Sequence, residues 1–107
     1  MTNFISTGST YWISDEEIQI LEKNATNGDK NAAFKLYQYH MFVSIDQDLE
    51  FKWLEIAAKN GHPIAQSNLA DLFFTQGNKE NAIFWAKKAY RNGAKLPDEL
   101  KILININ

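Results

Sequence analysis

Residues 53–69 have the sequence WLEIAAKNGHPIAQSNL, and residues 85–100 have the related sequence WAKKAYRNGAKLPDEL. Each stretch starts at a tryptophan and reaches an Asn-Gly pair, at Asn60-Gly61 and Asn92-Gly93. Another pair, Asn27-Gly28, lies 33 residues before Asn60-Gly61, which in turn lies 32 residues before Asn92-Gly93. Self-similarity at a period of this length is typical of stacked helical hairpins.

Apolar residues recur ten, eight and three positions before each glycine, which indicates one buried face of a helix in each copy. We expect the large side chains eight positions before each glycine to lie in the core. In the order of those three positions, the residues are Ile18, Phe51 and Ile83; Ile20, Trp53 and Trp85; and Ala25, Ala58 and Tyr90.

Signals for helix ends and helix starts agree with this period. Each Asn-Gly is predicted to end a helix, because glycine adopts the left-handed conformation at the C′ position without strain. Ser14 and Glu17 form a predicted capping box, in which Glu17 reaches back to the N-cap residue. Asp46 and Asn78, seven residues before the two repeat tryptophans, are predicted N-caps, and Pro63 and Pro97 suit first turns. The predicted helices cover residues 14–27, 30–43, 46–60, 63–76, 78–92 and 97–104.

The sequence thus predicts one all-α domain over residues 1–107, a short right-handed α-solenoid of about three stacked hairpins. An N-terminal extension, 1–13, precedes hairpins 14–43 and 46–76, and 78–104 is a third hairpin or a cap. The β-prone segment MFVSI, residues 41–45, is expected to be a helix end and its turn. For ILINI, residues 102–106, a terminal helix and an extended tail stay open.

Small residues facing large ones are expected to form the core, since alanines let helices approach closely while aromatic side chains fill the gaps. The expected small residues are Ala32, Ala57, Ala58, Ala65 and Ala89, and the large ones are Tyr37, Phe51, Trp53, Leu69, Phe73 and Trp85.

Residues 53–61, followed by Ala65 and Leu69, resemble the Sel1-like repeat, which also places an aspartate where Asp46 stands. The resemblance covers roughly residues 16–95 and implies a solenoid that binds protein on a concave face, with no common catalytic residues. Two departures keep a tetratricopeptide-like alternative open. The repeats are shorter than usual for Sel1, and Ala70 and the loop VSID, residues 43–46, replace the usual glycines.

Composition narrows the functional classes. The chain has no cysteine, so it cannot form a disulfide or a thiolate site. A net charge of −2 argues against nonspecific binding to nucleic acid, which needs a clustered positive surface. No secretory signal or membrane span is apparent in the sequence, which favours a cytoplasmic protein. We expect no cofactor and no metal.

Residues that could carry chemistry have simpler structural interpretations. His40 lacks a second histidine or carboxylate at ligand spacing, and His62 precedes a helix start, so core and capping roles are favoured. The acidic run at residues 46–50 fits N-capping better than a calcium loop, which would need a central glycine. The basic run at residues 86–91 fits a helix C-terminus. Because no nucleophile and base can be paired, an enzyme is the least favoured class.

Two exposed aromatic candidates remain. Trp12 precedes the first capping box and is expected to staple the first helix, with a partner anchor as the alternative. Phe84 occupies a position at which the other copies have Gln19 and Lys52, so it is expected on the solvated face as a candidate interface residue.

The favoured function is a small bacterial immunity or inhibitor protein that covers one active site of a toxin. A chain of this size suits an interface of about 800 Å² per partner, and its acidity suits a basic toxin such as a nuclease. The alternative is an adaptor in signalling or envelope assembly. We expect a monomer or weak dimer, with no direct contact to nucleic acid or membrane. The candidate partner-binding residues are Asp48, Lys52, Glu55, Lys59, Phe84 and Lys88.

Overall fold

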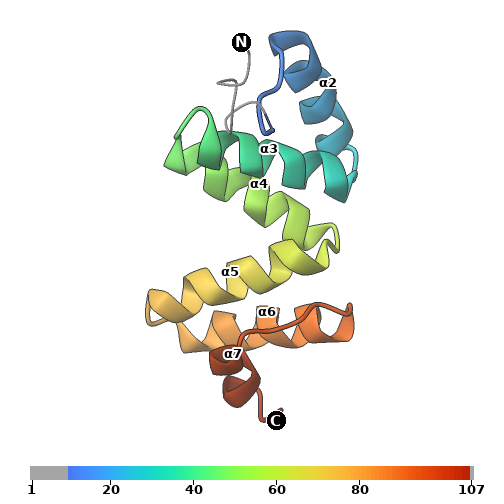
Figure 1. The fold of residues 1–107 in the computed structure, drawn as a ribbon. Helices are drawn as coiled ribbons and strands as arrows, with labels where there is room; N and C mark the ends of the chain where they lie inside the picture. The colour runs from blue at the N-terminus through green and yellow to red at the C-terminus, as the bar shows by residue number, and fades with distance from the viewer. Residues whose placement is uncertain (1–9, 107) are drawn as a thin grey trace.

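A computed structural model describes residues 10–106, and in this range the chain forms α-helices and no strand. The helices follow one another through short turns in an elongated stack, with α2 at one end and α7 at the other (Figure 1). The predicted all-α class is confirmed, and every predicted helix boundary lies within one residue of the observed one. The helices are α2 (Asp15–Thr26), α3 (Lys30–Phe42), α4 (Gln47–Lys59), α5 (Pro63–Thr75), α6 (Lys79–Arg91) and α7 (Asp98–Leu103).

The three predicted N-caps are confirmed. The side chains of Ser14, Asp46 and Asn78 each accept a hydrogen bond from a backbone N–H three residues later, at 3.1–3.2 Å. The capping box is only half formed, because no return bond from Glu17 to Ser14 is found among the described residues. The Glu17 carboxylate instead lies 3.4 Å from Lys35 Nζ on α3 and so links two helices.

Helix ends follow the predicted glycine rule. Gly28, Gly61 and Gly93 have φ values of 104°, 97° and 89°, in the left-handed region. At Gly61, the N–H of His62 donates to the Ala57 carbonyl and the N–H of Gly61 to the Ala58 carbonyl, both at 3.0 Å. This pair of bonds is the Schellman motif, which satisfies the last free carbonyls of a helix.

At three further helix ends the residue with the left-handed conformation was not predicted from the sequence. Gly77 closes α5 at φ 81°, and Asn105 closes α7 at φ 63° with the Ile106 N–H donating to the Lys101 carbonyl. The segment 102–106 therefore ends a helix in a tight turn, and the extended alternative is wrong. The end of α3 is different, because a left-handed residue there, Ile45, has φ 53° and a β-branched side chain.

Helix contacts are most extensive between α3 and α4 and between α5 and α6. The interface between α4 and α5 is smaller, and α7 makes only a small contact with α6. The two largest interfaces therefore join helices of different predicted hairpins. They pair α3 of hairpin 14–43 with α4 of hairpin 46–76, and α5 of hairpin 46–76 with α6 of segment 78–104.

Most of the predicted core residues are buried. Trp53 and Trp85 are 3% and 9% exposed, and all five core alanines, Tyr37 and Leu69 are buried as well. Phe73 is half-buried. Three expectations are wrong. Tyr90, at the repeat position of the buried Ala25 and Ala58, is 50% exposed. Ile20, at the repeat position of the tryptophans, is 59% exposed, since α2 is the first helix of the described residues and packs mainly on α3. Phe51 is partly exposed because it borders a hollow between α4 and α5.

The entry to α2 also differs from the expectation. Ile13, directly before the N-cap, is buried, whereas Trp12 is largely exposed, so the predicted staple role of Trp12 is wrong. The Tyr11 ring stacks on Phe42 at the end of α3, with 4.5 Å between ring centroids.

Within residues 10–106 no helix has both the length and the apolar character that crossing a bilayer requires.

Candidate protein-binding surface

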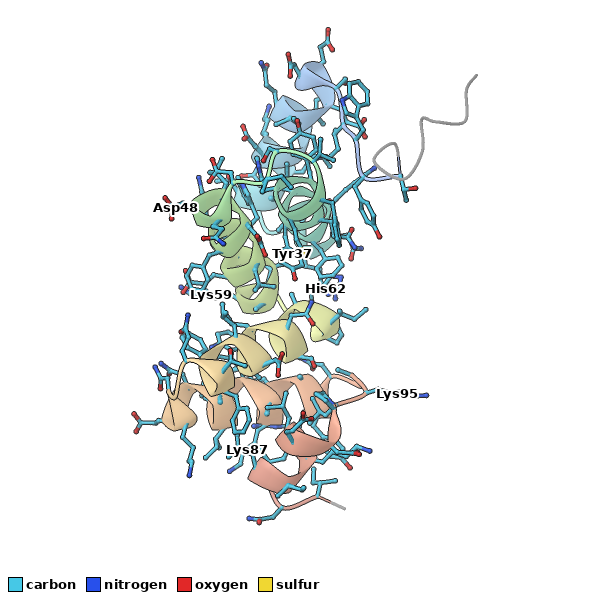
Figure 2. All side chains as sticks on the ribbon, turned by 60° about the vertical axis from the view of Figure 1, so that its left-hand side comes forward. Tyr37, Asp48, Lys59, His62, Lys87 and Lys95 are labelled. Carbon is cyan, nitrogen blue, oxygen red and sulfur yellow. The ribbon has the colours of Figure 1, made fainter. Side chains whose placement is uncertain are left out.

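Four of the predicted binding residues form a stripe along α4. Asp48, Lys52, Glu55 and Lys59 are spaced by three or four residues, so they share one face of the helix. Glu55 is half-buried and the other three are exposed. Figure 2 places Asp48 and Lys59 on one side of α4, near its two ends.

Contacts within this stripe are loose and face the solvent. Lys59 Nζ lies 3.8 Å from a Glu55 carboxylate oxygen, and Lys52 Nζ lies 4.7 Å from the ring centroid of Trp53. Exposed pairs of this kind contribute about 0–1 kcal/mol to stability. The fold therefore gains little stability from these charges.

The other two predicted residues lie on α6. Phe84 is 51% exposed, which confirms its expected place on the solvated face, and its ring edge contacts Trp85 at 5.1 Å between centroids. Lys88 Nζ lies 5.4 Å from the Phe84 ring centroid. The stripes on α4 and α6 are separate, since both helices pack on α5 and share no extensive interface.

Hollows in the surface are formed mainly by residues that sequence reasoning did not select. The larger one, about 600 Å³, lies between the start of α5 and the turn after α6, and it includes His62, Asn68, Asp71 and Lys95. Figure 2 shows His62 and Lys95 on the same side of the molecule. A second hollow of about 300 Å³ includes Tyr37 and Glu50 and shares Asn68 and Asp71 with the first. None of the six predicted binding residues borders either one, but Asp48 borders a third hollow of about 490 Å³ at residues 44–48. The polar pair Asn68 and Asp71, one turn apart on α5, is the signal that could have indicated the first two hollows.

A buried polar network holds the helices around these hollows. Gln66 donates from Nε2 to the Ala58 carbonyl at 3.0 Å and accepts from Asn92 Nδ2 at 2.9 Å, so it joins α4, α5 and the end of α6. Asn68 donates to the Tyr37 hydroxyl at 3.3 Å. Burial raises the pKa of Tyr37, the bond from Asn68 opposes that change, and the charge of Glu50 adds to it.

His62 has the predicted capping role. Its Nδ1 accepts from the Ala65 N–H at 3.2 Å, and its ring stacks on Phe34 of α3 at 4.1 Å between centroids. Burial, and then the nearby charge of Lys30, lower the pKa of His62. The neutral ring is therefore favoured, as an Nδ1 acceptor requires.

His40 is a core residue, as expected. It is buried in α3, its Nδ1 lies 2.8 Å from Ser44 Oγ, and its Nε2 has no hydrogen-bond partner among the described residues. Burial lowers the pKa of His40.

Across residues 10–106 no group of three histidine, aspartate or glutamate side chains is arranged to hold a metal ion. In the acidic run Asp46 is the N-cap of α4, which agrees with the capping interpretation.

These features define an all-α protein of antiparallel helix pairs that presents charged and aromatic side chains to solvent. No family model matches the sequence. Over 95 residues the chain is 35% identical to a protein of Escherichia coli (strain K12) described as "Uncharacterized protein YibG". The alignment covers 82% of this chain and spans 62% of the length of that relative. No solved structure matches.

Proposed function

We propose that the chain is a right-handed α-solenoid of the Sel1-like or tetratricopeptide-like type, and that it acts as a non-enzymatic protein-binding module. The equivalent burial of Trp53 and Trp85 in α4 and α6 supports a repeated unit. Consecutive helices that pack mainly on their neighbours in sequence, as here, are the general plan of solenoids.

The partner in this proposal is a bacterial toxin, which the chain neutralises as an immunity protein. Charge supports a basic partner, because residues 1–60 contain nine acidic and five basic residues, a formal charge of −4. The remaining residues carry four acidic and six basic side chains, a formal charge of +2. A nuclease, whose substrate-binding face is positive, would meet the acidic half with complementary charge.

The observation that carries the proposal of a protein-binding module is the exposure of Phe84 beside Lys88, which lie on α6 and so outside the acidic residues 1–60. A large aromatic side chain in water, supported by a cation over its ring, resembles the anchors that dominate protein interfaces. The repeat pattern does not require a phenylalanine there, since α4 has a lysine, Lys52, at the equivalent position.

The test uses the protein encoded beside the gene of this chain, produced in bacteria with and without the chain. We expect the neighbouring protein alone to stop growth, and co-production of this chain to restore it. Phe84→Ala should weaken binding of the purified pair about 30-fold or more, as a hot-spot loss of roughly 2 kcal/mol implies. Tyr90→Ala is the control, because Tyr90 lies on the same helix and is 50% exposed against 51% for Phe84. A neighbour from a secretion or envelope operon that binds without toxicity would favour the adaptor instead.

A further inference from the structure

The turn between α3 and α4 departs from the way the other left-handed helix ends are built. Gly28, Gly61, Gly77 and Gly93 have φ between 81° and 104°, and α7 ends at Asn105, a residue that tolerates this region. Ile45 adopts φ 53° with a side chain branched at Cβ. A β-branched residue in the left-handed region is crowded by its own backbone, so its conformation is unfavourable.

Packing does not explain the isoleucine. Its side chain is 70% exposed, so its apolar surface lies in water. The hydrogen bonds that close the turn run from the Ser44 N–H to the Tyr39 carbonyl at 3.1 Å and from the Asp46 N–H to the His40 carbonyl at 3.0 Å. All of these use the backbones of neighbouring residues. Asparagine or glycine would close the same turn at a lower conformational cost.

The surroundings of Ile45 indicate what its side chain meets. Phe42, three residues earlier, is also exposed, so the turn presents two apolar side chains. Asp48, three residues later, is exposed, forms no ion pair among the described residues and begins the charged stripe on α4. The turn also belongs to residues 1–60, the acidic part of the chain.

We infer that Ile45 is an anchor for the protein partner, inserting into an apolar pocket whose rim is basic and meets Asp48. This inference rests on the proposed function and extends it, since it names the element that enters the partner and the chemistry of the receiving pocket. A residue that breaks a local rule without a gain for the fold is expected at a functional position. Binding would supply that gain, because the exposed isoleucine surface becomes buried in the complex.

The test compares Ile45→Asn with Ile102→Asn. Both isoleucines are 70% exposed, but Ile102 lies on α7, which is not in contact with the α3–α4 turn, and it has no left-handed φ. The binding probe is the purified product of the neighbouring gene, inactivated by mutation and titrated in a calorimeter. Melting temperatures of the free variants are measured by circular dichroism.

We expect Ile45→Asn to melt at the same temperature as the wild type or higher, while its dissociation constant rises about 10- to 100-fold. Ile102→Asn should bind as the wild type does, and Ile45→Val, which keeps a branched apolar side chain, should retain most of the affinity. Opposite changes in stability and affinity cannot come from a residue that only supports the fold.

Two results would overturn the inference while leaving the proposed function intact. One is that the wild type binds the probe and the Ile45→Asn variant binds it with equal affinity. The other is an Ile45→Asn variant whose melting temperature falls by more than about 5 °C, a shift that marks a packing residue in a domain of this size. If the wild type itself does not bind the probe, the proposed function fails and the inference fails with it.

Discussion

Replacing Trp53 by alanine tests the packing that the repeat predicts. Trp53 and Ile20 stand at the same distance before an Asn-Gly pair, yet Trp53 is 3% exposed and Ile20 is 59% exposed. A buried tryptophan removes roughly 150–250 Å² from water, which at about 25 cal/mol per Å² is worth about 4–6 kcal/mol. Because alanine keeps part of that area and the site relaxes, we expect Trp53→Ala to lower the free energy of unfolding by about 3–5 kcal/mol. Ile20→Ala should change it by less than about 0.5 kcal/mol.

The measurement is urea unfolding followed by circular dichroism. With a urea dependence of about 2 kcal/mol per molar for a small domain, the Trp53→Ala midpoint should fall by about 2 M. Since a domain of this size has only about 5–10 kcal/mol of stability, Trp53→Leu provides a milder variant if the alanine variant does not fold. A Trp53→Ala variant within about 1 kcal/mol of Ile20→Ala would refute the assignment of Trp53 to the core.

Three further substitutions test local features. Gly61→Ala should cost about 1–2 kcal/mol in urea unfolding, because alanine is strained at φ 97° although its added methyl group would meet nothing within 4 Å. Asn92→Ala should cost about 1–3 kcal/mol in the same assay, because the buried side-chain oxygen of Gln66, Oε1, loses its hydrogen-bond donor. The wild type should lose stability as pH falls from about 6.5 towards the lowered pKa of folded His62, since the unfolded chain then binds more protons. His62→Asn, which keeps a capping oxygen without a titrating group, should reduce this loss, leaving the part due to His40.

Each of these expectations can be contradicted directly. A Gly61→Ala protein as stable as the wild type would mean that the turn adopts another conformation. Asn60→Ala is the control for Asn92→Ala, since Asn60 also caps a helix end but shows no side-chain bond among the described residues, and equal losses would show that only the cap matters. A pH profile unchanged in His62→Asn would mean that burial does not lower the pKa of His62 in the folded protein.

Helix positions could be predicted from the sequence because their signals are local. A cap or a left-handed glycine acts on backbone groups within about six residues, so Ser14, Asp46 and Asn78 were identifiable without knowledge of the fold. Gly77 uses the same geometry but follows glutamine rather than asparagine, so a search for Asn-Gly pairs passes over it.

Burial was predictable only where a neighbouring helix lies on the expected side. Ile20 fits the repeat pattern, but no earlier helix in the described residues covers its face, so the pattern fails at the end of the stack. The hollows around Asn68 and Asp71 were not predictable for a related reason. They depend on the angle at which α5 meets its neighbours, and side-chain spacing along one helix carries no information about that angle.

The Schellman closures have a consequence for how quickly the native state is reached. Each closure is complete within a few residues of chain, and each helix then packs mainly on the one before or after it. Few distant segments must find each other, so the loop entropy lost before favourable contacts form is small. Helical proteins dominated by such short-range contacts cross their folding barrier in microseconds to milliseconds. This chain therefore belongs among rapid folders, which expose their apolar surface only briefly during synthesis.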